Sequence, residues 1–181
     1  MVALLVVVLS LLIGGCVFLG RTEYPDHTVD RVDLSKYTGR WYEIASFPNW
    51  FQKGCTCTTA DYALADGHVT VTNSCRKGSP QGSLQVATGK AYVVPNSNNA
   101  QLRVQFQWPF KGDYWVIALD EDYQYAVVGH PQKKYLWILS RDPVMDAATY
   151  GRLVGIAAAK GYEVSRLVKT DQTCNDQPDG G

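Results

Sequence analysis

Residues 101–107 read Gln-Leu-Arg-Val-Gln-Phe-Gln, in which polar and apolar side chains alternate without a break. Successive side chains of a β-strand point to opposite faces of its sheet, so Leu102, Val104 and Phe106 share one face and the polar residues share the other. The stretch therefore predicts a β-strand that buries one of its two faces.

Strand patterns recur at short intervals on both sides of this stretch, with turn residues between them. Ala65-Asp66-Gly67 marks a hairpin, and Pro-Asn-Ser-Asn-Asn at residues 95–99 marks a loop. Seven further strands are predicted at residues 41–47, 58–64, 68–74, 84–94, 114–119, 124–129 and 135–140. Eight sequential strands predict an all-β, eight-stranded up-and-down antiparallel barrel, whose closure removes the sheet edges and leaves room for one small ligand. A two-sheet sandwich is the alternative.

The period of the apolar residues changes after the last strand. Apolar groups over residues 144–160 are spaced as in one amphipathic α-helix, with Asp142 as N-cap, Pro143 at the first position and Gly161 as the stop. An extended piece at residues 163–168 and a polar tail at residues 171–181 follow. The barrel and its C-terminal helix are thus expected to occupy residues 33–170.

The composition limits the function. The chain has 181 residues, 46% of them hydrophobic and 19% charged, and its 17 basic and 17 acidic side chains balance. This length suits one domain with a tail, the composition does not fit a disordered chain, and the neutral balance excludes the basic excess that nucleic-acid recognition uses. The five cysteines are an odd number, so in an oxidising compartment one of them needs a separate explanation.

Residues 1–15 contain no charged side chain. Their apolar run is about a dozen residues, shorter than the ~20 residues of a membrane-spanning helix and typical of a signal peptide. The sequence Ile13-Gly14-Gly15-Cys16 that follows resembles the lipobox of bacterial lipoproteins. It departs from that pattern in lacking a Lys or Arg at its start, and an ordinary signal peptide is the alternative.

The lipobox resemblance implies that Cys16 becomes the lipidated first residue of the mature chain and anchors it to the membrane through acyl chains. Residues 16–32 show no periodicity and are interpreted as a tether. Val17 is not the aspartate associated with retention in the inner membrane, so the resemblance implies the outer membrane, facing the periplasm. Because the chain is neutral, attachment is expected to depend on acyl chains rather than on a basic surface.

Three motifs in order carry a family resemblance. Gly39-Arg40-Trp41-Tyr42 opens the first strand, residues 116–123 (Val-Ile-Ala-Leu-Asp-Glu-Asp-Tyr) lie in the middle, and residues 135–141 (Tyr-Leu-Trp-Ile-Leu-Ser-Arg) come last. They resemble the signatures of the lipocalin family. The stretch from about residue 32 to residue 168 is similar to its bacterial outer-membrane lipoprotein members, which are relatives of apolipoprotein D.

The first and last motifs pair a large apolar ring with a planar cation. A guanidinium stacked on a tryptophan is worth about 0.5–2 kcal/mol. The resemblance implies that Trp41 and Arg141 form this pair and close the floor of the barrel, which is a structural role and not a catalytic one. Gly39, Tyr42 and Asp120 are expected to be structural as well, Asp120 as a turn residue.

Aromatic residues are the candidate ligand contacts. Alternation from Trp41 places Glu43, Ala45 and Phe47 on the interior face, and the next loop carries Trp50 and Phe51 at the mouth of the barrel. Further interior candidates are Tyr62, Tyr92, Phe106, Tyr114, Tyr125 and Trp137. Such rings suit a cavity that holds an acyl chain, and the resemblance implies a fatty acid or lysophospholipid. Lys90, Arg103 and Lys111 could meet its head group, or they are solvated surface charges.

Four cysteines remain once Cys16 is set aside. A bridge between Cys55 and Cys57 would be strained, which leaves two pairing schemes open. The resemblance implies Cys55–Cys75 and Cys57–Cys174. The alternative is a metal site at Cys55, Cys57 and His68, but His27, His68 and His130 lack ligand spacing and an oxidising compartment favours disulfides. No metal or cofactor is therefore expected.

The sequence thus predicts a membrane-anchored lipid-binding protein, not an enzyme, that stores or transports lipids in maintenance of the cell envelope. No pattern of a serine hydrolase is present. The alternatives are an enzyme on the same barrel that acts on a hydrophobic substrate, by isomerase or epoxide chemistry, and a tetrapyrrole carrier. The sequence leaves open a homodimer and the identity of the physiological ligand.

Overall fold

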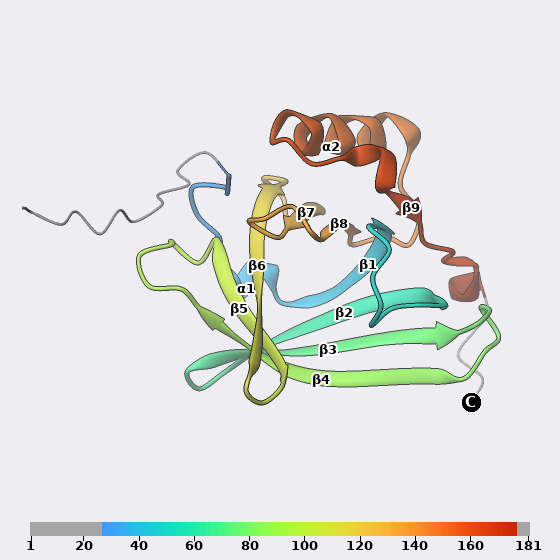
Figure 1. Cartoon of the computed structure of the whole chain (residues 1–181), viewed down its shortest axis with the longest axis horizontal. Helices are drawn as coiled ribbons and strands as arrows, with labels where there is room; N and C mark the ends of the chain where they lie inside the picture. Colours follow the sequence, from blue (N-terminus) through green and yellow to red (C-terminus); the bar gives the residue numbers. More distant parts are fainter. Residues whose placement is uncertain (1–26, 177–181) are drawn as a thin grey trace, which may run out of the picture.

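Eight strands follow one another as antiparallel neighbours and close into a barrel in the computed structural model, which describes residues 27–176 (Figure 1). The predicted signal peptide at residues 1–15 and the predicted lipidation site Cys16 lie outside the described residues. The barrel strands are β1 (Gly39–Ser46), β2 (Cys55–Ala65), β3 (His68–Lys77), β4 (Leu84–Val93), β5 (Gln101–Gln107), β6 (Phe110–Leu119), β7 (Tyr125–Gly129) and β8 (Leu136–Ser140). The predicted up-and-down barrel is confirmed, and the sandwich is excluded.

The barrel closes through β1, which pairs with β8 on one side and with β2 on the other. The pairing with β2 uses only Gly39–Tyr42, because the two strands then diverge. A ninth strand, β9 (Val168–Lys169), takes up the freed edge opposite Ala45 and Ser46. A two-residue strand carries no alternation, so sequence patterns did not predict it.

The two ends of the barrel differ. The connections β1–β2, β3–β4, β5–β6 and β7–β8 all lie at one end, which we call the mouth, and the other connections lie at the floor. The short helix α1 (Leu34–Tyr37) covers the floor just before β1, with Asp33 as its N-cap accepting from the Ser35 amide at 3.0 Å. Tyr37 is almost fully buried there.

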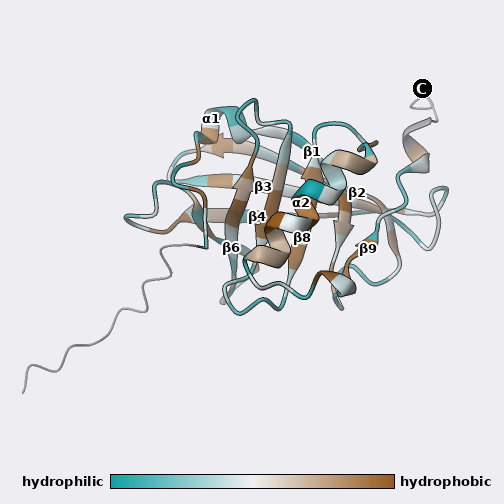
Figure 2. Cartoon of the chain, turned by 90° about the horizontal axis from the view of Figure 1, so that it is seen from above, coloured by the Kyte–Doolittle hydropathy of each residue, from teal (hydrophilic) through white to brown (hydrophobic). Residues whose placement is uncertain are grey.

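Two apolar clusters hold the fold together. One fills the floor half of the barrel interior around Trp41, Tyr37 and Tyr62. The other lies between the outer face of the wall and helix α2 (Ala147–Ala159), which contributes Leu153 and Ala157. Figure 2 shows α2 resting across the outside of the strands, with hydrophobic segments concentrated in the strands and hydrophilic ones in the loops.

The C-terminal region departs from the predicted helix boundaries. Helix α2 begins after Asp146, whose carboxylate accepts from the Thr149 amide at 2.9 Å, so Asp146 and not Asp142 is the N-cap. The predicted extended piece at 163–168 is instead a 3₁₀ turn, η1 (Val164–Arg166), followed by β9. A last turn, η2 (Thr173–Asp176), carries Cys174 within the stretch predicted as a polar tail.

The N-terminal side of the barrel begins earlier than expected. The amide of Val29 donates to the Val116 carbonyl at 2.9 Å, and Val32 is 1% exposed within the floor cluster. The end of the segment interpreted as a tether therefore packs on the barrel, because its two valines can reach the apolar interior. The rest of that segment lies outside the described residues.

Two disulfides lie in the mouth half of the barrel, one between two strands and one between a strand and the C-terminal segment. Cys55 on β2 is bonded to Cys75 on β3, and Cys57 is bonded to Cys174. This is the pairing that the family resemblance implies. The Cys57–Cys174 bridge holds the segment after β9 against the part of β2 that no longer pairs with β1.

Candidate ligand-binding site

The floor is closed by a stacked pair. Trp41 is fully buried, and the Arg141 guanidinium lies 3.9 Å from the centroid of its ring. The guanidinium also donates to the carbonyl oxygens of Arg40, Lys36 and Tyr123 at 2.7, 2.8 and 3.2 Å. One side chain thus joins α1, β1 and the β6–β7 turn, so the floor is a structural plug.

The other motif residues support this plug. Gly39 has a φ of +88°, which favours glycine, and it lies next to Arg141: a Cβ at that position would be in ordinary contact with Nη1 at 3.5 Å. Asp120 accepts from the amides of Asp122 and Gln124 at 3.1 and 3.3 Å, which makes it a turn residue. Tyr42 is half-buried beside Trp41 on β1.

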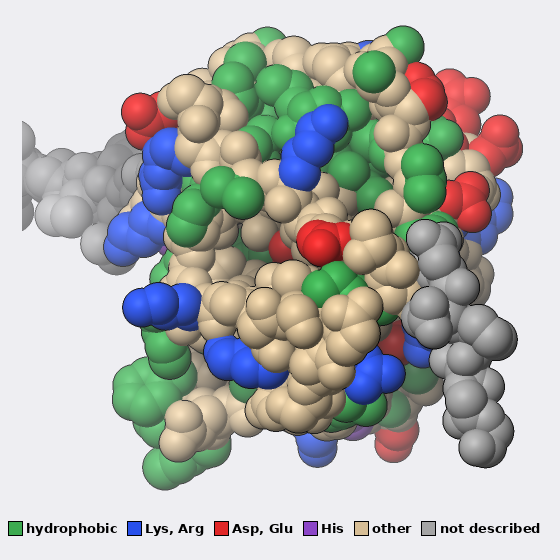
Figure 3. All heavy atoms as spheres, turned by 90° about the vertical axis from the view of Figure 1, so that its right-hand side faces the viewer, with side chains coloured by type: hydrophobic (Ala, Val, Ile, Leu, Met, Phe, Trp, Pro, Cys, Tyr) green, Lys and Arg blue, Asp and Glu red, His purple; other side chains and the backbone are tan. Residues whose placement is uncertain are grey.

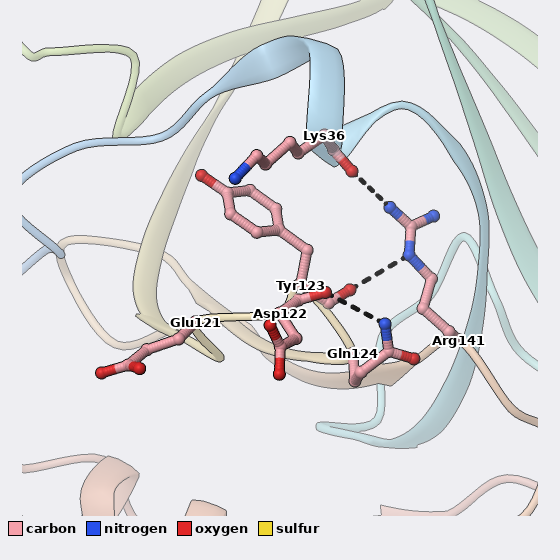
Figure 4. A pocket seen from close by; sticks show the side chains of 6 residues that line it. All are labelled: Lys36, Glu121, Asp122, Tyr123, Gln124 and Arg141. Atoms are coloured by element: carbon pink, nitrogen blue, oxygen red, sulfur yellow. Dashed lines mark hydrogen bonds between the residues drawn. The ribbon is translucent and has the colours of Figure 1, made fainter.

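Two shallow clefts lie at the floor and not inside the barrel. One, of about 340 Å³, is lined by Lys36, Glu121, Asp122, Tyr123, Gln124 and Arg141. Figure 4 shows that its cation, Arg141, is already hydrogen-bonded to the backbone of Lys36 and Tyr123. The other, of about 410 Å³, lies beside Gly39 and the outer end of β2. Arg141 is thus engaged in the plug, and the other cation of the first cleft, Lys36, lies 5.7 Å from the centroid of the Tyr123 ring. The barrel interior is therefore the candidate ligand site.

Three tyrosine hydroxyls meet deep in the barrel. The hydroxyl of Tyr114 lies 2.7 Å from that of Tyr37 and 3.0 Å from that of Tyr62. Burial raises the pKa of Tyr62 to about 12 and raises the pKa of the other two well above their usual value, so all three are neutral. Three hydroxyl protons serve two hydrogen bonds, which leaves one proton free to bond a polar group of a ligand or a water.

Small residues line the interior wall above the tyrosines. Ala91 belongs to the interior cluster, and counting by two along β4 puts Gly89 and Ala87 on the same face. Ala60 and Ala126 lie on the interior side of β2 and β7 in the same way. Eight-stranded barrels can hold one small ligand, and short interior side chains favour this, although at Gly89 the Phe106 ring takes up the space that a side chain would need.

A polar network spans the mouth and is centred on Gln52 in the β1–β2 loop. Its side chain donates to Glu43 at 2.7 Å and accepts from Asn49 at 2.7 Å and from the Trp137 indole at 3.0 Å. Glu43 is only 6% exposed and also accepts from Ser46 and Thr170 at 2.9 and 2.6 Å. These bonds fasten the β1–β2 loop to β1 and β8 at the rim of the mouth, and we call this loop the lid.

Aromatic rings lead from the surface into the barrel. Trp50, 82% exposed, contacts Phe51 at 5.6 Å between centroids, and Phe51 contacts Tyr135 at 5.5 Å. Tyr135 in turn lies 5.7 Å from Trp137, which packs against the interior cluster. An apolar molecule thus meets a continuous aromatic path from the mouth to the interior.

The predicted ligand contacts fall into two groups. Tyr62, Tyr114 and Trp137 lie in or against the interior cluster. Phe106 shares the interior face of β5 with Leu102 and is 45% exposed toward the mouth, where Trp50 and Phe51 also lie. Together these residues outline one route into the barrel.

Three predicted contacts lie elsewhere, and their placement corrects the sequence analysis. Phe47 is buried in the cluster under α2, because a bulge between Glu43 and Ala45 interrupts the alternation that starts at Trp41. Tyr125 packs against that same outer cluster, since its neighbour Ala126 faces inward. Tyr92 follows the inward Ala91 and meets the Lys111 ammonium, 4.6 Å from its ring centroid, on the outer surface.

The proposed head-group cations are not gathered in the barrel. Arg103 lies 3.6 Å from Asp113 in a solvent-exposed ion pair, Lys111 covers Tyr92, and Lys90 is exposed beside the inward Ala91.

Sequence reasoning missed Gln52, Tyr37 and Thr58. The first two lie outside the strands, where no period marks an inward side chain. Thr58 has the one buried side-chain oxygen, among the described residues, that makes no hydrogen bond. Thr58 lies in the part of β2 where a register shift between Thr56 and Thr59 interrupts the pairing with β3, so alternation does not define its face.

The described residues hold neither a cluster of metal ligands nor a helix able to cross a membrane. Within residues 27–176 no group of three His, Cys, Asp or Glu side chains is arranged to hold a metal ion. None of the helices described is both long and apolar enough to cross a membrane.

Comparison with known proteins agrees with this geometry. The family model described as "Lipocalin-like domain" matches residues 32–172. Temperature-induced lipocalin-1 of Arabidopsis thaliana is 43% identical over 80% of this chain and 82% of its own. The outer membrane lipoprotein Blc of Vibrio cholerae is 34% identical over 94% and 98%, and mouse apolipoprotein D is 34% identical over 81% of each chain. Insecticyanin from the tobacco hornworm Manduca sexta, at 24% identity, has the same fold with a TM-score of 0.66 over 80% of this chain and 83% of its own.

Proposed function

The chain belongs to the lipocalin family, whose members hold hydrophobic small molecules, and on that premise we propose that it binds the acyl chain of a fatty acid or lysophospholipid in the barrel. The observation that carries the proposal is the combination of an interior wall of small residues with an aromatic path from the mouth. An apolar interior reached along aromatic rings suits an acyl chain.

The polar groups of the lumen suit a lipid with one polar end. The one free hydroxyl proton of the tyrosine cluster at the floor can be donated to a carboxylate, ester or phosphate oxygen. The Glu43 carboxylate lies at the mouth, so an anionic head group is expected to avoid it.

The cellular setting follows from the relatives and the N-terminal motif. The Blc relatives are outer membrane lipoproteins, which supports an outer-membrane location for this chain. We infer that Cys16 carries the acyl anchor, that the domain faces the periplasm and that it stores or transfers lipids for the cell envelope. The four described cysteines form two disulfides, so the described residues offer no thiol for isomerase chemistry.

The test places a bulky side chain on the inner face of β4 and compares lipid binding with that of a variant carrying the same side chain on the outer face, one residue away. Ala87→Trp adds a ring to the interior face of β4, whereas Thr88→Trp adds the same ring to the outer face, where Thr88 pairs with Thr72. Displacing about two methylenes of an acyl chain, at ~0.8 kcal/mol each, should weaken binding on the order of tenfold. Binding of palmitate and lysophosphatidylcholine to the delipidated full chain is measured by native mass spectrometry and fluorescence titration.

The expected result is that Ala87→Trp loses affinity and Thr88→Trp keeps it. Absence of uptake of either lipid by the wild-type chain, or an equal loss in both variants, would overturn the proposal. Visible absorbance of the purified protein would point to a tetrapyrrole instead.

A further inference from the structure

The mouth of the barrel is surrounded by exposed aromatic side chains. We define the mouth loops as residues 47–54, 76–85, 106–111 and 130–135, which join the strands at this end. All five exposed Phe and Trp side chains among the described residues lie in them, namely Trp50, Phe51, Phe106, Trp108 and Phe110. Trp108 is 84% exposed and Phe110 is 73% exposed. Exposure of so many rings at one end is costly in water and indicates an interaction surface.

The same loops are basic, although the whole chain is neutral. The mouth loops contain six Lys and Arg residues and no Asp or Glu: Lys53, Arg76, Lys77, Lys111, Lys133 and Lys134. The connections at the floor (residues 64–68, 93–101, 119–125 and 140–147) have the opposite composition, with six acidic residues and one basic residue. Positive charge is thus concentrated in the loops at the mouth and negative charge in those at the floor, although the whole chain has no net charge.

Hydrophobic and basic side chains also lie together in the surface view. Figure 3 shows the side of the molecule on which β3 ends, where hydrophobic side chains lie beside several Lys and Arg side chains. Acidic side chains are few in the lower half of this face.

We propose that the mouth loops dock directly onto a lipid bilayer that contains anionic phospholipids. Tryptophan rings favour the interface between head groups and acyl chains, and lysines next to them are attracted by the negative surface potential. Trp50, Trp108 and Phe110 enter this interface, while Lys53 and Lys134 contact lipid phosphates and Lys111, whose ammonium lies over Tyr92, adds positive charge beside Phe110. The acidic floor then faces away from the membrane, so the surface charge also selects the orientation.

This docking goes beyond the proposed function, because it provides a route by which a lipid enters the barrel from the bilayer. With the mouth on the bilayer, an acyl chain passes from the membrane to the aromatic path without crossing water. The orientation is compatible with an anchor at Cys16, because the eleven residues from Cys16 to His27 can span about 36–40 Å when extended, more than the ~33 Å of a ten-residue strand such as β4.

The test uses the full chain with Cys16→Ser, so that no acyl anchor is attached. Vesicles of phosphatidylcholine, with or without a minor fraction of phosphatidylglycerol, carry brominated acyl chains that quench nearby tryptophan fluorescence. One variant combines Trp108→Ser and Phe110→Ser, which lie outside the aromatic path, and a second combines Lys53→Glu, Lys111→Glu and Lys134→Glu. Val144→Ser and Arg152→Glu are the matched controls, since both residues are exposed and lie outside the mouth loops.

We expect quenching of the parent chain on the anionic vesicles. The aromatic variant, which lacks the interfacial fluorophore Trp108, is compared by co-flotation with the same vesicles, and we expect it to lose binding. Each basic residue near a charged membrane is worth about fivefold in affinity, so loss of three positive charges should weaken binding on the order of a hundredfold, and the added negative charges of the charge variant should weaken it further. High salt should reduce binding of the parent, and both controls should bind like the parent.

Three outcomes would overturn the proposal: equal binding to vesicles without phosphatidylglycerol, equal losses in the controls, or dimerisation in solution that the aromatic substitutions abolish. The last would assign the mouth to a second copy of this chain. Circular dichroism and lysophosphatidylcholine binding of each variant show that the barrel is intact. They also separate failure of docking from failure of the proposed ligand binding.

Discussion

The Gln52→Ala substitution should release the lid over the mouth. Gln52 makes three side-chain hydrogen bonds, one to the Glu43 carboxylate at 2.7 Å and two from Asn49 and the Trp137 indole at 2.7 and 3.0 Å. A bond to a charged group contributes about 1.5–3 kcal/mol and a neutral one about 0.5–1.5 kcal/mol. Because the loop is only half-buried, we take about 3 kcal/mol for the three together, which corresponds to a roughly 150-fold shift toward the open loop.

Amide hydrogen exchange measures this shift directly. Protection of the β1–β2 loop should fall about a hundredfold in Gln52→Ala, while the strands on the far side of the barrel keep theirs. Gln105→Ala is the matched control, because Gln105 is half-buried on β5. The release rate of a bound acyl chain should rise with the opening of the loop.

Substitution of the same residue by glutamate gives a second, independent readout. Gln52→Glu places a carboxylate in hydrogen-bond contact with Glu43. Two such carboxylates do not both ionise without cost, so the loop should be closed at acidic pH, where one is protonated, and open at neutral pH. Loop protection within twofold of the wild type in Gln52→Ala, or no pH dependence in Gln52→Glu, would refute the role of this network.

Three further predictions concern stability. Arg141→Met should lower the free energy of unfolding by about 2–4 kcal/mol, because it removes the stack on Trp41 and three hydrogen bonds to backbone carbonyls. Urea unfolding measures this loss, and Arg141→Lys should lose less stability. A loss below about 0.5 kcal/mol in Arg141→Met would contradict the role of the plug. Burial raises the pKa of Tyr62 to about 12 from 10, so the folded state keeps its proton where the unfolded chain loses it. The contribution of Tyr62 to the free energy of unfolding is complete below pH ~10 and falls by about 2.7 kcal/mol as the pH rises toward ~12. Tyr62→Phe should therefore reduce the dependence of unfolding free energy on pH, measured by unfolding after rapid pH jumps. An unchanged pH dependence would be evidence against the buried hydroxyl. Replacing both cysteines of the Cys57–Cys174 bridge by serine should cost about 5 kcal/mol against about 3 kcal/mol for Cys55–Cys75, because the two bridges close separations of 117 and 20 residues; calorimetry that shows the reverse order would contradict this.

The barrel could be read from the sequence because its strands are long and alternate. The stretch at residues 101–107 and the hairpin at Asp66-Gly67 both appear where they were predicted. Interior side chains followed from the same period wherever the ladder is regular, as for Tyr62 and Tyr114. The same count along β4, from Ala91, would have placed Tyr92 outside.

Predictions from side-chain alternation were wrong where the backbone is not a regular β-strand. The bulge in β1 turned Phe47 toward α2, an event that no residue in that stretch signals. Gln52 and Tyr37 lie in a loop and a short helix, so their inward direction depends on tertiary contacts that alternation does not encode. The basic mouth was concealed for a related reason: the charges are scattered along the chain, and only the hairpin topology brings them to one end.

The ninth strand determines when the barrel can be completed. β1 is the first strand to leave the ribosome or the translocation channel, yet two of its partners, β8 and β9, are among the last. Until residue 169 has emerged, the mouth half of β1 keeps an unpaired edge that other chains can join. Barrel closure is therefore a late event in biogenesis, and chains that end before β9 are expected to aggregate rather than to accumulate as open barrels.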